Sequence, residues 1–278
     1  MIHLRTQSEM DTIAHAGSII GRLHAEYATF VKPGVSTADH DRVSEDFIVE
    51  HDGAIPAFKG LYGVPGSVCI SVNEEVVHGI PSVHRVLEDG DIVSIDVGVK
   101  LDGWYSDSAW TFAVGEVSEE ATALMDVTER SLTAAIDASV SGKHVGDIGA
   151  AVMSTVNGDG YGIIRELVGH GVGRELHEEP QVPNYGRAGH GPLLREGMVL
   201  AIEPMLSAGT PRIKTLEDGW TVITADRSLS AHFEHTVGIT KDGPRVLTRA
   251  DSAPAAMDAA SGVAGGTLEG AVPAPEGG

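Results

Sequence analysis

The sequence is short of cysteine, of positive charge and of long apolar runs. Cys69 is the only cysteine among 278 residues, so no disulfide can form within the chain, and a single thiol is typical of a reducing compartment. The 19 basic residues are outnumbered by 40 acidic ones, and a net charge of −21 without a Lys/Arg cluster argues against a nucleic-acid binder. No run reaches the roughly 18 apolar residues of a membrane span, and the N-terminus lacks a signal-peptide stretch. We therefore expect a cytoplasmic protein that does not enter a membrane.

Apolar side chains are present in ordinary amount, at 42% of the residues, as in a globular enzyme. Their spacing predicts four helices. The first begins near Ser8, the second runs from Thr37 to about His51, and the other two cover 118–141 and 145–158. Short runs rich in β-branched residues predict strands over 67–72, 91–100, 104–114, 163–168, 198–203, 220–225 and 231–240. This order of blocks favours an α+β fold, an antiparallel sheet with helices on one face.

The composition changes near Ala250. From there to Gly278 the chain consists of Ala, Gly, Pro and scattered acids, with few large apolar residues. Such a segment buries too little surface to offset the entropy of ordering it. We expect one domain over residues 1–249 and a disordered acidic tail over 250–278.

Carboxylates stand in places where charge is costly. Asp96 lies inside the apolar run "IVSIDVGV", and Asp107 follows on the returning strand after an Asp-Gly turn. His170 lies in "VGHGVG", Glu203 ends the apolar run "GMVLAIE", and Glu234 lies among strand formers in "SAHFEHTVGIT". Each residue alone is explained by a hydrogen bond or by solvent. Together they would repel one another unless cations neutralise them, and oxygen ligands with imidazole predict a divalent transition-metal site, with a metal pair accounting for the number of acids.

Two other motifs carry less weight. The glycine-rich "GHGVG" is not followed by Lys-Ser/Thr, so it does not predict a phosphate loop. His170 and His177 are seven residues apart, which is not the i, i+4 spacing of a helical zinc motif, so these imidazoles must come from a loop or from strands.

The chain resembles the type I methionine aminopeptidases from about residue 3 to about residue 248. The resemblance rests on five blocks that occur in the family's order: "SVNEEVVHGIP", "IVSIDVGVKLDGWYSDSAWTFAVG", "VGHGVGRELHEEPQVPNYG", "LREGMVLAIEPML" and "SAHFEHTVGIT". It implies the pita-bread fold, a curved antiparallel sheet with helices on its outer face and two pseudo-symmetric halves around a central dimetal site. It also implies that residues 1–249 form a metallopeptidase domain that removes N-terminal methionine and prefers a small second residue.

The resemblance further implies which residues bind metal. The family's ligands fall on Asp96, Asp107, His170, Glu203 and Glu234. Asp107 and Glu234 would bridge two divalent ions (Co, Mn, Fe or Zn), with Asp96 on one ion and with His170 and Glu203 on the other.

The resemblance also assigns the chemistry and the substrate pocket. Glu203 would carry the proton, His177 would support the oxyanion, and His78 would orient the substrate. Without the resemblance, the sequence around His78 would favour a structural histidine in a loop. The family's pocket positions fall on Phe58, Leu61, Val64, Cys69, Leu176 and Trp220. Three of these are aliphatic here where aromatic residues are frequent, which predicts a looser pocket. His232 stands where the family more often has Gln, and its effect is open.

Two alternatives remain at this level. An Xaa-Pro dipeptidase would keep the five ligands but usually carries a large N-terminal domain. A non-catalytic peptide-binding module of the same fold would lose ligands, whereas all five are present. The expected partners are peptides and nascent chains that begin with Met. The resemblance also implies a transient ribosome contact, although the charge of −21 opposes a strong electrostatic one. We expect a monomer.

Overall fold

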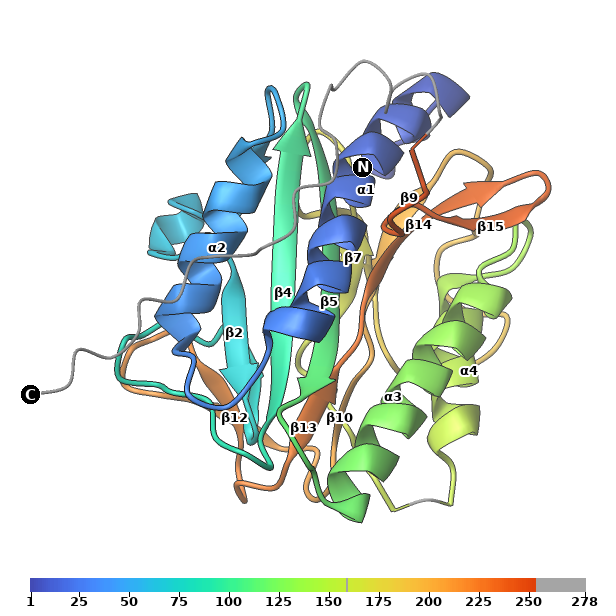
Figure 1. The fold of residues 1–278 in the computed structure, drawn as a ribbon. Coiled ribbons are helices and arrows are strands. Elements are labelled where there is room, and N and C mark those ends of the chain that lie inside the picture. Colours follow the sequence, from blue (N-terminus) through green and yellow to red (C-terminus); the bar gives the residue numbers. More distant parts are fainter. Residues whose placement is uncertain (159, 254–278) are drawn as a thin grey trace, which may run out of the picture.

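A computed structural model describes residues 1–158 and 160–253 (Figure 1). The α-helices within these residues are α1 (Gln7–Phe30), α2 (Thr37–Val49), α3 (Glu119–Ala138) and α4 (Val145–Val156). Three of the four match their predicted ranges to within a few residues. The first begins at Gln7, because Thr6 rather than Ser8 is the N-cap: its side chain accepts from the Glu9 N–H, and the Glu9 carboxylate accepts from the Thr6 N–H.

Two ten-residue strands dominate the sheet structure, and the other strands are short. The first group is β1 (Ile55–Pro56), β2 (Cys69–Val72), β3 (Glu75–Val77), β4 (Ile92–Leu101), β5 (Trp104–Ala113), β6 (Gly162–Ile163), β7 (Gly169–Gly171) and β8 (Glu178–Val182). The second group is β9 (Val199–Ile202), β10 (Met205–Ser207), β11 (Ile213–Thr215), β12 (Val222–Thr224), β13 (Ser230–His232), β14 (His235–Thr240) and β15 (Gly243–Val246). All the pairings given for these strands are antiparallel, as the sequence predicted.

The β4–β5 hairpin forms as its sequence predicts. Its strands pair from Ile92 with Ala113 to Leu101 with Trp104. The turn residues Asp102 and Gly103 both have positive φ, 52° and 77°, as a two-residue type I′ turn requires.

Two predicted strands are wrong. The range 163–168 forms only β6, because its partner β10 is three residues long. The range 231–240 is split into β13 and β14, which pair with β10 and β9 respectively. The split falls opposite Pro204, which lacks the N–H that a continuous ladder would need there. This break creates two short gaps that hold Glu203 and Glu234.

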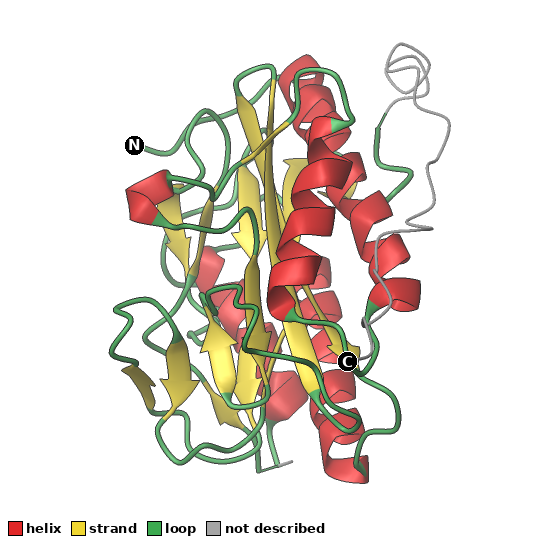
Figure 2. Ribbon diagram, turned by 60° about the vertical axis from the view of Figure 1, so that its left-hand side comes forward, coloured by secondary structure: helices red, strands yellow, loops and turns green. Residues whose placement is uncertain are grey.

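The helices cover one face of the strands, as Figures 1 and 2 show from two sides. Helix α1 packs on β4 and β5, and α2 packs on β1 and β2. Helix α3 packs on β9, β10 and β13, and α4 packs on β8, so that each pair of helices surrounds its own buried apolar cluster. A pair of helices over antiparallel strands therefore occurs twice, as pseudo-two-fold halves. The odd-numbered residues of β4 from Val93 to Val99 face the helices, so the even-numbered ones, Asp96 and Gly98, face away from them.

None of the helices in the described ranges is both long and apolar enough to cross a bilayer. The domain boundary at 249 stays a prediction; after it, the Ser252 N–H donates to the Arg249 carbonyl, and Ala253 is buried. The rest of the predicted tail, 254–278, lies outside the described residues.

Candidate metal centre and substrate cavity

The β4–β5 hairpin places two carboxylates on the face away from the helices. Asp96 is paired with Ala109, and Asp107 is paired with Gly98, so the two acids are diagonal neighbours on one face. Cys69 on β2 is paired with Asp96 and shares that face.

The other half of the fold contributes three ligand-type side chains. His170 lies in the centre of β7, Glu203 directly follows β9, and Glu234 lies between β13 and β14. Glu203 and Glu234 occupy the break opposite Pro204, where no ladder fixes their direction. Both carboxylates are therefore free to face the hairpin.

Hydrogen bonds join the two halves directly behind the acids. The Thr236 hydroxyl accepts from the Asp107 N–H at 3.0 Å and donates to the Asp107 carbonyl at 2.8 Å. The Glu234 N–H donates to the Ala109 carbonyl at 2.8 Å. The buried Asn184 amide donates to the Glu203 carbonyl at 2.9 Å. Thr236 and Asn184 were not predicted from sequence, because an ordinary Thr in a strand and an Asn in a loop carry no signal there.

The acids and the imidazole come within coordination distance of one another. Among the described residues, Asp107, His170 and Glu234 form a group whose ligand atoms all lie within 4.8 Å of one another. His170 Nε2 lies 3.9 Å from Asp107 Oδ2 and 3.6 Å from Glu203 Oε1. The carboxylate of Asp96 lies beside that of Asp107. The resemblance assigns Asp96 and His170 to different ions, so no direct contact between these two residues is expected.

The electrostatics of this cluster fit a bound cation. Burial raises the pKa of Asp96 to about 7. Burial also raises the pKa of Asp107 well above its usual range, and the charges of Glu234 and Asp96 add to the effect. The pKa values of Glu203 and Glu234 are raised in the same way, by burial first and by neighbouring carboxylates second. One oxygen each of Asp96, Asp107 and Glu234 is buried and has no hydrogen-bond partner among residues 1–158 and 160–253. Divalent ions would supply the missing partners.

His170 is prepared as a nitrogen ligand. Its Nδ1–H donates to the Gly171 carbonyl at 2.9 Å, which directs the lone pair of Nε2 towards Asp107 and Glu203. Burial, with the nearby His177, lowers the pKa of His170 to about 4, so the ring is neutral at pH 7. A neutral imidazole is the form that binds metal.

His78 and His177 lie at the cavity and are more exposed than His170. The His177 ring is 4.4 Å from the His170 ring, centroid to centroid. Burial lowers the pKa of both His78 and His177. His78 has φ of +61°, a left-handed conformation that is rare outside glycine and that is often found at functional sites.

A single cavity of about 280 Å³ contains all thirteen predicted site residues in its wall. Its apolar end is formed by Phe58, Cys69 and Leu176, which are buried, and by Leu61, Val64 and Trp220, which are partly buried. Gly98 is required beneath this end, because a Cβ there would lie 2.7 Å from Phe58 Cε1. The metal cluster and the apolar pocket are therefore adjacent parts of one wall.

The sequence prediction missed several residues of this wall. Tyr62, Val77, Ile80, Leu167, Val168 and Met205 also line the cavity. The aromatic Tyr62 could have been noticed in the glycine-rich "FKGLYGVPG", and its ring stacks on His177 at 6.4 Å between centroids. His232, singled out without a role, lines the cavity beside Glu203 and Glu234.

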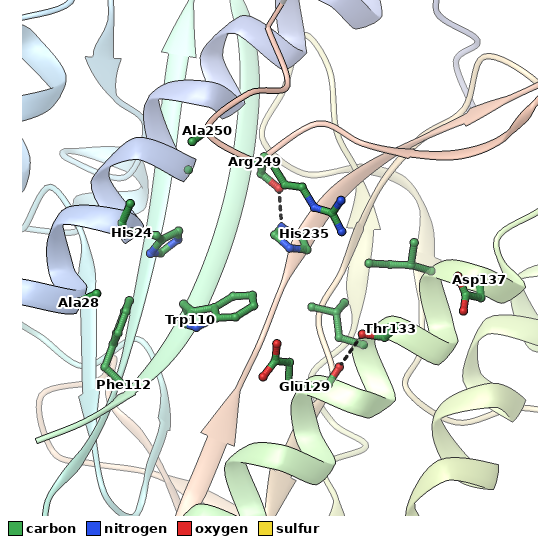
Figure 3. Close-up of a pocket in the computed structure, with 15 residues that line it drawn as sticks. His24, Ala28, Trp110, Phe112, Glu129, Thr133, Asp137, His235, Arg249 and Ala250 are labelled. Carbon is green, nitrogen blue, oxygen red and sulfur yellow. Dashed lines mark hydrogen bonds between the residues drawn. The ribbon is translucent and has the colours of Figure 1, made fainter. Parts of the chain in front are cut away.

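A second, wider cavity of about 460 Å³ opens on the helical face of the sheet. Figure 3 shows it between His24 and Ala28 of α1 and Glu129 and Thr133 of α3, with Trp110 at its floor. None of the thirteen predicted site residues lines it, and the metal-type cluster found among the described residues lies elsewhere. The smaller cavity is therefore the candidate active site.

Comparisons with known proteins agree with this site. The profile of a family described as "Metallopeptidase family M24" matches residues 11–241. A methionine aminopeptidase from Clostridium acetobutylicum is 50% identical over 248 residues, which cover 89% of this chain and 99% of that one. The structure of methionine aminopeptidase from Thermotoga maritima has a TM-score of 0.87 at 44% identity, covering 90% of this chain and 100% of the other. A Pyrococcus furiosus prolidase, at 24% identity and a TM-score of 0.72, matches 88% of this chain and 65% of that one, and shares the fold alone.

The fold, the cluster of acids and imidazole, and these matches define the class: the chain belongs to metallopeptidase family M24. Within that family it belongs to the methionine aminopeptidases, since it is 49–50% identical in sequence to three of them over 99–100% of their length. The resemblance carried by the five sequence blocks is thereby confirmed. So is the pita-bread fold.

Proposed function

We propose that this protein removes N-terminal methionine from peptides and nascent chains by hydrolysis at a dinuclear metal centre. The observation that carries the proposal is the shared cavity wall: five ligand-type side chains stand beside an apolar pocket in one cavity. An apolar first side chain held in this pocket would place the adjoining backbone at the metal cluster. Such an arrangement suits the release of a single terminal residue.

Five residues would hold the metal ions. Asp107 and Glu234 would be shared by the two ions, Asp96 would bind one of them, and His170 with Glu203 would bind the other. The mixed oxygen and nitrogen donors suit Mn, Fe, Co or Zn. When bound, the ions lower the pKa of a shared water towards neutrality and so supply a nucleophile.

The protein's own groups then move the proton and support the charge. Glu203, whose pKa is raised by burial, accepts the proton of the water and delivers it to the leaving amine. His177 donates a hydrogen bond to the carbonyl oxygen of the substrate as negative charge develops there. His78, on the same cavity wall, orients the amide nitrogen or the next residue.

Substrate choice would come from the apolar end of the cavity. Phe58, Cys69 and Leu176 bury an unbranched side chain such as the thioether of methionine. Leu61 and Val64 replace aromatic walls with flexible aliphatic ones, which favours tolerance for other apolar first residues. His78 and His177 line the cavity and would limit the space for the second residue of the substrate, which favours a small one.

The proposal also covers the location, the partners and the oligomeric state of the protein. A cytoplasmic location is supported by the single thiol, which is buried. Peptides beginning with Met are the proposed partners, and the net charge of −21 disfavours a strong contact with ribosomal RNA. We propose that the protein acts as a monomer.

A peptide assay tests the proposal and separates it from its rivals. With added Mn²⁺ or Co²⁺ the protein is expected to release Met from Met-Ala-Ser; chelation should abolish turnover and metal should restore it. Cleavage of dipeptides with proline second, without action on Met-Ala-Ser, would instead identify a prolidase-like enzyme. Absence of turnover on both substrates by metal-loaded protein would identify a binding module.

The His177→Ala variant is expected to lower kcat by about 10²-fold, because it removes a donor to the developing oxyanion. His177 is exposed, so the melting temperature should not change. Steady-state kinetics on Met-Ala-Ser measures the effect, and the exposed His84→Ala serves as the matched control. A kcat equal to that of the control would remove His177 from this role.

A further inference from the structure

The loop that carries His177 is not part of the sheet. Residues 172–177 connect β7 to β8 and belong to no helix or strand. They include two residues of the candidate site: Leu176 is buried in the apolar pocket, and His177 lines the cavity. The positions of both side chains therefore depend on contacts other than the strand ladder.

Glu178, the first residue of β8, closes this loop with its carboxylate. Its Oε1 atom accepts from the Arg174 N–H at 2.8 Å and from the Glu175 N–H at 3.2 Å. Backbone N–H bonds to a charged carboxylate are stronger than those to a neutral acceptor. Leu176 and His177 thus form the tip of a short ring of chain that the Glu178 side chain closes.

Arg5 neutralises the same carboxylate from the N-terminal segment. Its guanidinium forms an ion pair with Glu178 Oε2, and each of the two side chains is 9% exposed. The Arg5 N–H donates to the Gly197 carbonyl, which fixes the segment that precedes α1. Gly173 leaves the space for the guanidinium, because a Cβ there would overlap with Arg5 Nη2. The pairing matters because a buried carboxylate without a partner is costly.

A second contact fixes the loop against the β4–β5 hairpin. The Arg174 guanidinium lies 3.8 Å from the centroid of the Trp104 ring. It also donates to the carbonyls of the turn residues Asp102 and Gly103, at 3.4 Å and 3.3 Å. The loop is therefore held between the N-terminal segment and the hairpin that carries two of the acids.

We propose that Glu178, paired with Arg5, is the positioning residue of His177. Neither Glu178 nor Arg5 lines the cavity, so both act through the loop rather than on the substrate. The inference rests on the proposed function, in which His177 donates to the carbonyl oxygen as negative charge develops. Such a donor stabilises the charge only when it is aimed at the place where the charge appears, so a small shift of the loop lowers the rate.

A double-mutant cycle tests the coupling between Glu178 and His177. Glu178→Gln keeps the volume and one acceptor oxygen but removes the negative charge that Arg5 faces. On Met-Ala-Ser it should lower kcat by about tenfold or more in the unmodified chain and by less than about twofold in the His177→Ala background, because the two residues act as one unit. Similar losses in both backgrounds, or no loss in the unmodified chain, would overturn the inference and leave the proposed function intact. If the unmodified chain released no methionine, the proposed function itself would fail, and the inference with it.

Variants of Arg5 separate the charge from the packing. Arg5→Met should lower kcat by a factor similar to that of Glu178→Gln, and Arg5→Lys, which retains the charge, should keep kcat within about threefold of the unmodified chain. The matched control is Glu175→Gln, the same chemical change on an exposed side chain of the same loop, which should leave kcat unchanged. An equal loss for Arg5→Lys and Arg5→Met would show that the ion pair does not hold the loop.

Hydrogen exchange measures the loop without relying on turnover. In metal-free Glu178→Gln, the amides of Arg174 and Glu175 should exchange at least about tenfold faster than in the unmodified chain, while the amides of β4 change less. Unchanged exchange at these two amides would contradict the role of the carboxylate. Equal acceleration in β4 would show that the substitution loosens the whole fold, and the inference would fail.

Discussion

Replacing Glu203 with Gln is expected to lower kcat on Met-Ala-Ser by about 10²- to 10⁴-fold, the range that a positioned proton carrier supplies. Gln keeps the volume and a ligand oxygen but cannot take up and release the proton. Metal content and peptide affinity should therefore stay within a few-fold of the unmodified protein. Rapid-quench kinetics for turnover and calorimetry for peptide binding check the two halves of this expectation.

The matched control is Glu129→Gln, a residue of α3 that lines the second, wider cavity on the helical face of the sheet (Figure 3). It makes the same chemical change on the opposite side of the sheet, and its kcat should be unchanged. A Glu203→Gln variant that retained more than about a tenth of the control's kcat would place the proton transfer on another group.

In metal-free protein, the Asp96→Asn variant is expected to unfold less readily than the unmodified chain at pH 8. Burial raises the pKa of Asp96 from 3.8 to about 7 in the folded state. Above pH 7 the folded protein thus carries a disfavoured charge that Asn removes. Three pKa units correspond to about 4 kcal/mol as an upper bound, and sharing among neighbouring acids reduces the expected gain to about 1–3 kcal/mol.

The pH dependence has a definite sign. Between pH 3.8 and about 7 the folded protein binds more protons at Asp96 than the unfolded chain does, so this group's destabilisation disappears as the pH falls. The advantage of Asp96→Asn should accordingly shrink from pH 8 towards pH 4. Urea unfolding with chelator over this range measures it, with the exposed Asp126→Asn as control.

Metal should reverse the order. An ion that binds the folded protein alone stabilises it by RT ln(1 + c/Kd) at a free ion concentration c, so tighter binding stabilises it more, and Asp96→Asn lacks one anionic ligand. With saturating Mn²⁺ the unmodified chain is therefore expected to become the more stable of the two. Equal metal-induced stabilisation of both proteins would show that Asp96 is not a ligand.

Much of the fold was predictable because it depends on local patterns. Helical spacing of apolar residues located α1 to α4, and the Asp-Gly pair located the β4–β5 turn. The helix cap at Thr6 was missed, although Thr6 and Glu9 form a capping box that is visible in the sequence. The prediction of one strand over 231–240 failed for a different reason. The strand is split because Pro204 lies opposite it in the partner segment, and that segment precedes it by almost thirty residues in the sequence.

The candidate site shows the same division. Asp96 and Asp107 could be paired from the hairpin alone, since strand alternation puts them on one face. His170, Glu203 and Glu234 joined them through family resemblance rather than through any local pattern. Thr236, Asn184 and Tyr62 were not found, because their partners lie far away in the chain.

The sequence by itself determined the kinds of ligand-type side chain, the lengths of the helices and the direction of the β4–β5 hairpin, because each depends on neighbours a few residues apart. Only the tertiary structure decided that the acids share one cavity wall with an apolar pocket, and that His232 faces Glu203 across from His170. The physical reason is that these contacts join strands of the two halves. Their geometry is set by the ladder break at Pro204 and by the hydroxyls of Thr111 and Thr236, which tie β5 to the segment that carries Glu234.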